Sequence, residues 1–287
     1  MILVTGAAGK TGLAVIKALS ETGETVRAMV HNKTYRNAVS EAGAGQVVVG
    51  NLILSDDILE AVQGVRAIYH IPPNVHPGEL EMGKLLINAA RSAKVSHFVY
   101  HSVLHPQIES MPHHWQKLRV EEYLIESGVP YTILQPAIYM QNITSSLPEI
   151  KEKGIYLVPY SVKTILSLVD LKDLAEVAGI VLSNQYHHGA IYELVGNDAQ
   201  TQQEIALALT EVLDREVQAQ QMSLAYWERQ AKTSGLDSYQ INTLVKMFQH
   251  YEQFGFIGNL GVLSWLLGRQ PTTLKNCLKV EIAELDI

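Results

Sequence analysis

Three glycines lie between an apolar strand and an amphipathic helix at the start of this 287-residue chain. Gly6, Gly9 and Gly12 follow the apolar run 1–4 and precede apolar residues at helical spacing. Glycine adopts a positive φ at little cost and leaves no Cβ in the way of a ligand. Such a turn exposes main-chain amides at the positive end of a helix, where a dinucleotide diphosphate binds, although tight strand–helix packing alone would also select glycine. The predicted contacts are Gly6, Ala8, Gly9, Lys10, Thr11 and Gly12.

Strand and helix patterns alternate through the first half of the chain. The expected strands are 1–4, 25–30, 46–50, 67–71, 97–102 and 131–135, and expected helices include 35–42, 56–62, 79–93 and 114–127. Continuously apolar strands such as 47–49 are typical of a parallel sheet that is covered on both faces. Right-handed crossovers then predict an α/β fold with a doubly wound parallel sheet of the Rossmann type.

This rhythm changes after Pro136. Residues 142–153 are expected to be helical, with Pro148 breaking or kinking the helix, and a capping box at Thr201 and Glu204 predicts another helix start. Several aromatic residues follow in the C-terminal part. We therefore predict a dinucleotide-binding domain over 1–137 and a smaller, mostly helical α/β domain over 138–287, with some return to the sheet.

Composition excludes several classes of protein. The chain is 47% hydrophobic and 18% charged, its formal net charge is −7, and Cys277 is its only cysteine. The sequence contains no basic stripe, so we do not expect direct binding of nucleic acid. It also contains no apolar run that is long enough to span a bilayer. A single cysteine forms no intramolecular disulfide, and no residue set has zinc-like spacing. We expect a cytoplasmic protein without a metal site.

The segment after the second expected strand bears on the choice of dinucleotide. It carries His31, Lys33 and Arg36, and no acid precedes Glu41. An acid here would bind the ribose 2′-hydroxyl of NAD, whereas cations pair with the 2′-phosphate of NADP. NADP(H) is therefore favoured over NAD(H), and a merely solvated basic loop is the alternative.

Further cofactor contacts are expected after the third and fourth strands. The amide of Asn51 can bind an adenine edge and Leu52 can pack on the ring, although Asn51 also suits an ordinary turn. Ile71 and Pro72 would lie along the adenosine and ribose, where proline removes a backbone donor and stiffens the wall.

The motifs together resemble one family. Run 4–12, Val-Thr-Gly-Ala-Ala-Gly-Lys-Thr-Gly, is similar to the glycine motif of the NmrA-like family of atypical short-chain dehydrogenases/reductases. Residues 117–136 resemble its lysine–helix–strand signature, and 139–142, 169–175, 192–196 and 268–271 resemble later landmarks. The resemblance implies a Rossmann-type domain, NAD(P) binding and a smaller C-terminal domain. The family includes quinone and other small-molecule reductases, and also dinucleotide-binding regulators that catalyse nothing.

One departure from the resemblance concerns catalysis. Typical short-chain dehydrogenases use Tyr-x-x-x-Lys, in which tyrosine donates the proton and lysine lowers its pKa and holds the nicotinamide ribose. Here His113 stands in the place of the tyrosine, Lys117 is retained, and Ser102 lies near the polar residue of the group. The expected catalytic residues are Lys117, His113 and Ser102, of which Ser102 and Lys117 also bind cofactor. The remaining expected contacts are Pro136 and Ile138 to cofactor and Tyr139 and Asn142 to substrate.

Two functions are left open, and catalysis itself is uncertain. The first is an NADPH-dependent reductase of a quinone-like or other small flat substrate by hydride transfer, which needs little acid help. The second is a non-catalytic NADP(H)-sensing regulator that acts through a protein partner. Sugar-nucleotide epimerisation is a weaker third possibility because it needs the missing tyrosine. The sequence does not determine the oligomeric state.

Overall fold

The computed structural model describes residues 1–285, which form two compact units. The first unit comprises residues 1–107, 113–135 and 174–192, and the second comprises the rest of the described chain. Each unit is described by itself below. The expected division at residue 137 stays a prediction.

A seven-stranded sheet forms the centre of the first unit. Its strands are β1 (Ile2–Val4), β2 (Val26–Val30), β3 (Gln46–Val49), β4 (Ala67–His70), β5 (His97–His101), β6 (Tyr131–Pro136) and β10 (Ala190–Leu194). They lie in the order β10-β6-β5-β4-β1-β2-β3. β1 pairs in parallel with β2 and β4, and parallel pairing continues to β3 on one side and to β5 and β6 on the other. This arrangement confirms the predicted Rossmann-type fold, in which ligands bind where the strand order reverses, here between β1 and β4.

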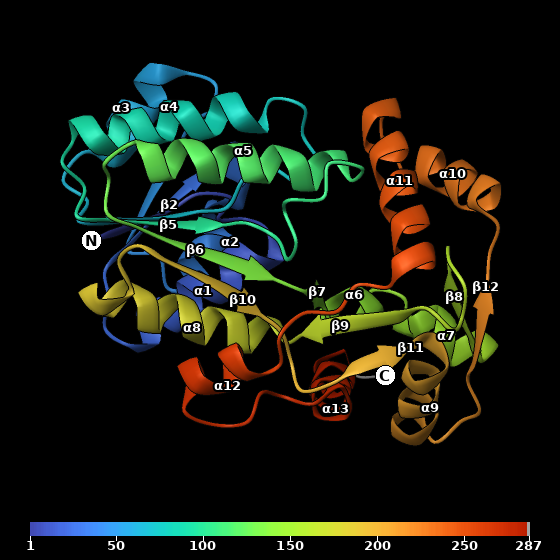
Figure 1. Ribbon diagram of the computed structural model, residues 1–287. Coiled ribbons are helices and arrows are strands. Elements are labelled where there is room, and N and C mark those ends of the chain that lie inside the picture. Colours follow the sequence, from blue (N-terminus) through green and yellow to red (C-terminus); the bar gives the residue numbers. More distant parts are fainter. Residues whose placement is uncertain (286–287) are drawn as a thin grey trace. The chain divides into compact units, whose positions relative to one another are not determined.

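Helices cover both faces of this sheet. They are α1 (Lys10–Glu21), α2 (Arg36–Glu41), α3 (Ser55–Val62), α4 (Glu79–Ser92), α5 (Pro112–Glu126) and α8 (Leu171–Ser183), with short 3₁₀ turns η1 (Lys33–Tyr35) and η2 (Gln185–His187). α3, α4 and α5 lie on one face, and α1 and α8 lie on the other (Figure 1). Ile58, Leu86 and Leu124 from the first group pack in one buried cluster with Phe98 and Tyr100 of β5.

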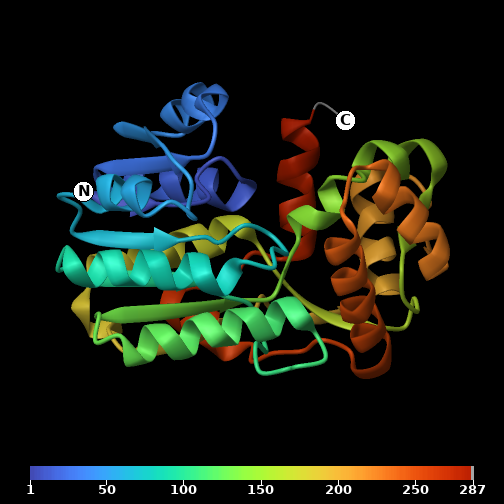
Figure 2. The same ribbon diagram turned by 90° about the horizontal axis from the view of Figure 1, so that it is seen from above.

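Close packing of α4 and α5 positions the polar residues described below. The two helices lie side by side (Figure 2), and a Cβ at Gly83 would approach Val120 Cγ1 to 2.8 Å. Glycine therefore permits this helix pair to approach closely, as a contact distance of 2.8 Å leaves no room for a methyl group. As a result, the start of α4 faces the middle of α5, where Glu79 meets Lys117.

The second unit combines short strands with helices. Its strands are β7 (Ile138–Tyr139), β8 (Ile155–Val158), β9 (Ile165–Val169), β11 (Ala199–Thr201) and β12 (Gln218–Gln221), which form the sheets β11-β9-β7 and β12-β8. Its helices are α6 (Gln141–Thr144), α7 (Leu147–Lys153), α9 (Gln202–Leu213), α10 (Leu224–Thr233), α11 (Ser238–Phe254), α12 (Gly261–Leu267) and α13 (Leu274–Glu284). The predicted capping box is present, since Thr201 and Glu204 bond each other's backbone amides. The helix expected over 142–153 is two helices, because Pro148 begins α7.

Two observations concern membranes and metals. None of the helices within residues 1–285 combines the length and apolar character that crossing a bilayer requires. Over the same residues, no three His, Cys, Asp or Glu side chains converge into a possible metal site.

Cys277 is buried in α13, which agrees with the expectation that it is a small core residue.

Candidate cofactor and catalytic site

The glycine turn after β1 has no room for side chains at two of its three glycines. Gly6 has a φ of +60°, and a Cβ there would lie 2.7 Å from the carbonyl oxygen of Ile71. A Cβ at Gly12 would lie 2.4 Å from the carbonyl oxygen of Gly6 and 2.6 Å from Ala7 Cα. At Gly9 the nearest atom would be 3.4 Å away, an ordinary contact. Gly6 thus allows the turn to approach the residue after β4, Gly12 allows α1 to approach the turn itself, and Gly9 would accommodate a Cβ.

This turn leads into α1 in a way that suits an anion. Gly9 is the N-cap residue, offers no side-chain cap and is followed by no acid in the first turn. Gly9 and Lys10 are exposed, and Thr11 is half-buried. The first amides of α1 therefore lack a side-chain acceptor and lie at the positive end of the helix dipole. The turn fits the diphosphate of a dinucleotide.

The segment after β2 is exposed and positively charged. Asn32 caps η1 by accepting a hydrogen bond from the backbone of Thr34, and the rings of His31 and Tyr35 lie 5.2 Å apart. The side chains of Lys33 and Arg36 are exposed, and within residues 1–285 no carboxylate pairs with either. Both cations are therefore not engaged by a described carboxylate, and their predicted contact with a phosphate stays a prediction.

Asn51 and Leu52 have local roles in the turn after β3. The Asn51 side chain accepts a hydrogen bond from Ile53 N at 3.2 Å, and Asp57 accepts one from Asn51 N at 2.8 Å. Leu52 is half-buried against the core cluster of the first unit. Their predicted contacts with adenine stay predictions.

Ile71 and Pro72 follow β4 directly and adjoin the glycine turn. Ile71 N donates to Thr5 Oγ1 at 3.1 Å, which ties the ends of β1 and β4 together. Pro72 is buried. Ile71 adjoins Gly6 of the glycine turn, and the predicted contacts of Ile71 and Pro72 with the cofactor stay predictions.

Lys117 forms an ion pair that the sequence did not predict. Its Nζ lies 2.9 Å from Glu79 Oε1, which also accepts a hydrogen bond from the hydroxyl of Tyr100 at 2.9 Å. Glu79 is only 1% exposed and Lys117 is 14% exposed. Burial and the neighbouring Glu79 carboxylate raise the pKa of Tyr100 well above its ordinary value. The predicted contact of Lys117 with ribose stays a prediction, and such a contact must share the ammonium group with Glu79.

Ser102 belongs to a second buried cluster. The acid of this cluster, Glu121, lies one helical turn after Lys117 on α5. The Ser102 hydroxyl donates a hydrogen bond to Glu121 Oε1, and Gln135 Nε2 lies 3.0 Å from each oxygen of the same carboxyl group. Burial raises the pKa of Glu121 above its ordinary value, although the bonds from Ser102 and Gln135 and the charge of Lys117 act in the opposite direction.

Burial keeps several histidines neutral near this edge of the sheet. It lowers the pKa of His113 to about 3, with the charge of Lys117 as the second cause. The pKa values of His70 and His101 are also lowered to about 3 by burial and Lys117. Among the described residues, Nδ1 of His113 has no hydrogen-bond partner. The predicted proton-donor role of His113 stays a prediction, and at neutral pH the ring is an uncharged imidazole.

The other predicted contacts belong to the second unit. Pro136 is buried as the last residue of β6, and Ile138 and Tyr139 form β7, which pairs with Leu168 and Val169 of β9. Asn142 is exposed in α6. Their cofactor and substrate roles stay predictions.

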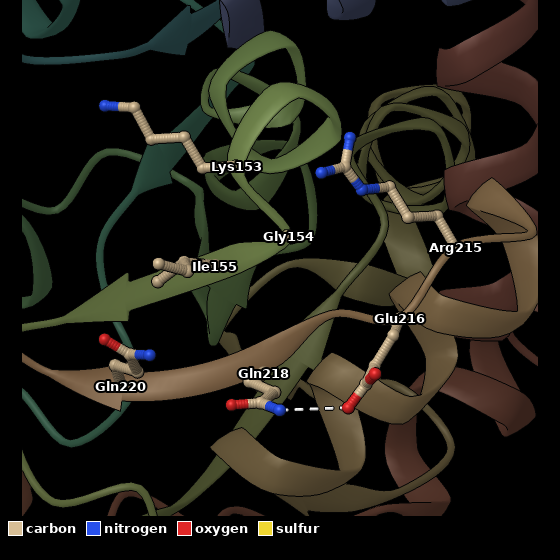
Figure 3. A pocket seen from close by; sticks show the side chains of 7 residues that line it. All are labelled: Lys153, Gly154, Ile155, Arg215, Glu216, Gln218 and Gln220. Carbon is tan, nitrogen blue, oxygen red and sulfur yellow. Dashed lines mark hydrogen bonds between the residues drawn. The ribbon is translucent and has the colours of Figure 1, made fainter.

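A surface pocket of about 420 Å³ lies in the second unit (Figure 3). Its two cations are already engaged: Lys153 pairs with Glu149, and Arg215 donates to the carbonyl oxygens of Lys151 and Glu152 at the end of α7. Gln218 donates to Glu216 at its rim, as the dashed line shows (Figure 3). These contacts join α7 to the segment before β12, and we assign the pocket no ligand.

Sequence reasoning missed Glu79, Tyr100 and Glu121 as members of the site. Glu79 lies within the expected helix 79–93 and Tyr100 within the expected strand 97–102, and neither is assigned a role from the sequence. The available signal was the spacing of Lys117 and Glu121, because residues four apart lie on one helix face.

Comparison with known proteins gives matches along the whole chain. Quinone oxidoreductase 2 of Escherichia coli (strain K12) is 29% identical over 278 residues, which cover 96% of each chain. An NAD(P)H azoreductase of Xenophilus azovorans is 26% identical and covers 99% of this chain and 98% of its own. A crystal structure of an NADPH-dependent quinone oxidoreductase from Escherichia coli in complex with NADPH has a TM-score of 0.85 and 27% identity, with complete coverage of both chains.

The family assignment rests on an even longer match. The NmrA-like family matches residues 1–285, from β1 to the end of α13. The glycine turn, the strand order and the lysine of α5 all lie within that match. This chain belongs to the NmrA-like family.

Proposed function

We propose that this chain is an NADPH-dependent reductase that transfers hydride to a quinone or a similar flat acceptor. The observation that carries the proposal is the likeness, over the complete chain, to an NADPH-dependent quinone oxidoreductase. The second relative, an azoreductase, also acts on a conjugated acceptor. A small-molecule substrate is therefore common to these relatives.

The chain's own residues support the cofactor. The glycine turn and the first amides of α1 would hold the diphosphate, and Lys33 and Arg36 would pair with the 2′-phosphate. The bound nicotinamide supplies the hydride. Lys117, fixed by Glu79, places a positive charge at the carboxyl end of the sheet, where negative charge on a reduced acceptor is stabilised.

A steady-state assay tests this proposal. We expect NADPH oxidation that depends on enzyme and acceptor for at least one member of a panel of benzoquinones, naphthoquinones and azo dyes, and slower turnover with NADH. Lack of turnover above the rate without enzyme, for every acceptor and both cofactors, would refute the reductase.

One observation favours a second candidate, a regulator that senses NADP(H) and acts through a protein partner. The tyrosine of Tyr-x-x-x-Lys is absent, and Lys117 is held by Glu79 rather than by a phenol acting on substrate. A pull-down from lysate with and without NADP(H) distinguishes the two candidates. The regulator requires a partner whose retention changes with nucleotide, and a partner that is indifferent to nucleotide would contradict it.

A further inference from the structure

A hydroxyl and a carboxyl group meet out of solvent at the carboxyl end of the central sheet. Ser102 follows β5 directly and is 2% exposed, and Glu121 on α5 is 3% exposed. They are joined by a hydrogen bond between Ser102 Oγ and Glu121 Oε1. A hydrogen bond gains strength where water is excluded.

Gln135 makes this pair stable in either protonation state. Its Nε2 lies 3.0 Å from both Oε1 and Oε2 of Glu121. When a proton sits on Oε1, the amide still donates to Oε2, so the carboxyl group keeps its position. The site can therefore gain or lose one proton while only the Ser102 hydroxyl proton reorients.

The proton on Glu121 fixes the direction of the Ser102 hydroxyl. With Glu121 ionised, Ser102 donates inward and offers only lone pairs outward. With Glu121 protonated, the carboxylic acid donates to Ser102 Oγ, and the hydroxyl proton of Ser102 turns outward as a donor.

Burial favours a retained proton on Glu121, whereas the bonds from Ser102 and Gln135 and the charge of Lys117 favour ionisation. Lys117 on the same helix is the charged group that favours ionisation, but Glu79 on α4 neutralises part of its charge. Tyr100 on β5 also faces the carboxyl group and stays protonated, because burial and Glu79 raise its pKa. Burial outweighs the opposing influences, so the pKa of Glu121 lies above its ordinary value. By contrast, the nearby His113 is held neutral, because burial lowers its pKa to about 3.

We propose that Glu121 is a positioning residue that acts through Ser102, storing the proton that Ser102 delivers to a reduced acceptor. This inference rests on the proposed function, because the acceptor oxygen becomes basic only after it has received hydride. The Ser102 O–H bond then breaks as the acceptor O–H bond forms, and the proton on Glu121 Oε1 moves to Ser102 Oγ. Glu121 ends as a carboxylate and regains a proton from solvent. The relay replaces the tyrosine that this chain lacks.

An NMR titration tests whether Glu121 holds a proton, and it needs no catalysis. Glutamate side chains are labelled with a carbon isotope at the carboxyl position, and the Glu121 signal, assigned by its loss in Glu121→Gln, is followed by NMR as a function of pH. We expect its midpoint to lie above the ordinary glutamate value of 4.5. Ser102→Ala should move that midpoint to higher pH, since the variant removes a bond that stabilises the carboxylate. A midpoint at or below the ordinary value, or one that Ser102→Ala leaves unchanged, would overturn the proposal.

Kinetics separates a relay from a structural role. Glu121→Gln should lower kcat for a quinone by on the order of 10²-fold with little change in KM, because only proton delivery is lost. We expect kcat of the wild type to fall at high pH, where Glu121 ionises. The kcat of Glu121→Gln should not show this fall. Glu122→Gln is the matched control, because Glu122 is the exposed neighbour on α5 and pairs with Arg119. Equal pH profiles for wild type and Glu121→Gln would refute the relay.

Thermal unfolding of each variant identifies any that fail to fold, and Glu121→Asp, which keeps a carboxyl group, should recover part of kcat. The failure of the proposed function looks different from the failure of the relay. If the protein oxidises no NADPH but the titration midpoint of Glu121 is raised and responds to Ser102→Ala, the reductase is refuted and the coupling of Glu121 to Ser102 stands. If the protein reduces quinone but the titration midpoint of Glu121 is ordinary, the relay is refuted and the reductase stands.

Discussion

His70 should make the fold sensitive to acid. It is fully buried at the end of β4, and its Nδ1 lies 2.7 Å from Thr5 Oγ1. Burial, with the charge of Lys117 as the second cause, lowers the pKa of His70 from 6.5 to about 3. The folded chain therefore keeps this ring neutral over a range of pH in which the unfolded chain binds a proton.

The sign and size of the effect follow from linkage. Between pH 6.5 and about 3 the unfolded chain carries one more proton at His70 than the folded chain, so stability falls as pH falls through this window and is fully present above it. At roughly 1.4 kcal/mol for each pH unit, His70 costs about 0.8 kcal/mol at about pH 6 and about 2 kcal/mol at about pH 5. Domains are stable by only about 5–15 kcal/mol, so this loss is measurable.

Urea unfolding of wild type and His70→Asn at about pH 7.5 and about pH 5 measures this difference. Asparagine can accept the hydrogen bond of Thr5 but does not titrate, so the variant should be less stable near neutral pH because of lost packing. Between the two conditions the wild type should lose about 2 kcal/mol more than the variant. His31→Asn is the control, since the exposed His31 ring should leave the wild-type pH dependence unchanged. Parallel pH dependence in wild type and His70→Asn would refute the reasoning.

Three further changes test the cofactor turn and the ion pair. Lys33→Glu with Arg36→Glu should weaken NADPH binding at least ~10-fold in calorimetry, since each charged bond is worth ~1.5–3 kcal/mol, and should leave NADH binding nearly unchanged. Gly12→Ala should weaken NADPH binding and lower unfolding free energy by about 1–3 kcal/mol, because its Cβ has no space. Glu79→Gln should cost roughly 3 kcal/mol in urea unfolding, because Lys117 is left without its buried counter-ion.

Each of these changes has its own contradicting outcome. Equal losses of NADPH and NADH affinity would remove the 2′-phosphate assignment. Gly9→Ala is the control for the turn, because its Cβ meets nothing closer than 3.4 Å, and an equal loss of stability in both alanine variants would refute the steric argument. Glu81→Gln is the control for the ion pair, since Glu81 in the same helix is exposed and pairs with Lys84. A similar cost for Glu79→Gln and Glu81→Gln would contradict the importance of burial.

The parallel sheet was predictable because its signals are local. The apolar run 1–4, the glycine turn and the helix that follows are contiguous, so one β–α unit can be recognised from a short window. The strand β12 of the second unit was not predicted, for the opposite reason. β12 is Gln-Ala-Gln-Gln and carries no strand pattern, and it becomes a strand by pairing with β8, more than 50 residues earlier.

The site was predictable only where its residues carried motif signals. Ser102 and Lys117 were given roles from the resemblance, whereas Glu121 stood in the 117–136 signature without a role and Glu79 lay outside every motif. Charged residues on helices are usually solvated, so nothing in the sequence marked these two as buried. Their burial depends on the close packing of α4 against α5 at Gly83, which is a tertiary contact.

Tyr100 does not replace the tyrosine that is missing from Tyr-x-x-x-Lys, because its surroundings raise its pKa. In the typical arrangement, lysine lowers the pKa of the phenol so that it exchanges protons with substrate. Here Glu79 stands beside Lys117 and accepts a hydrogen bond from Tyr100, so burial and Glu79 raise the pKa of Tyr100 instead. The Tyr100 phenol therefore holds its proton, and the ammonium group of Lys117 is bound to Glu79. Glu121, the other buried acid near Lys117, is bonded to the Ser102 hydroxyl instead of a phenol, so the relay proposed above uses Ser102 and not Tyr100.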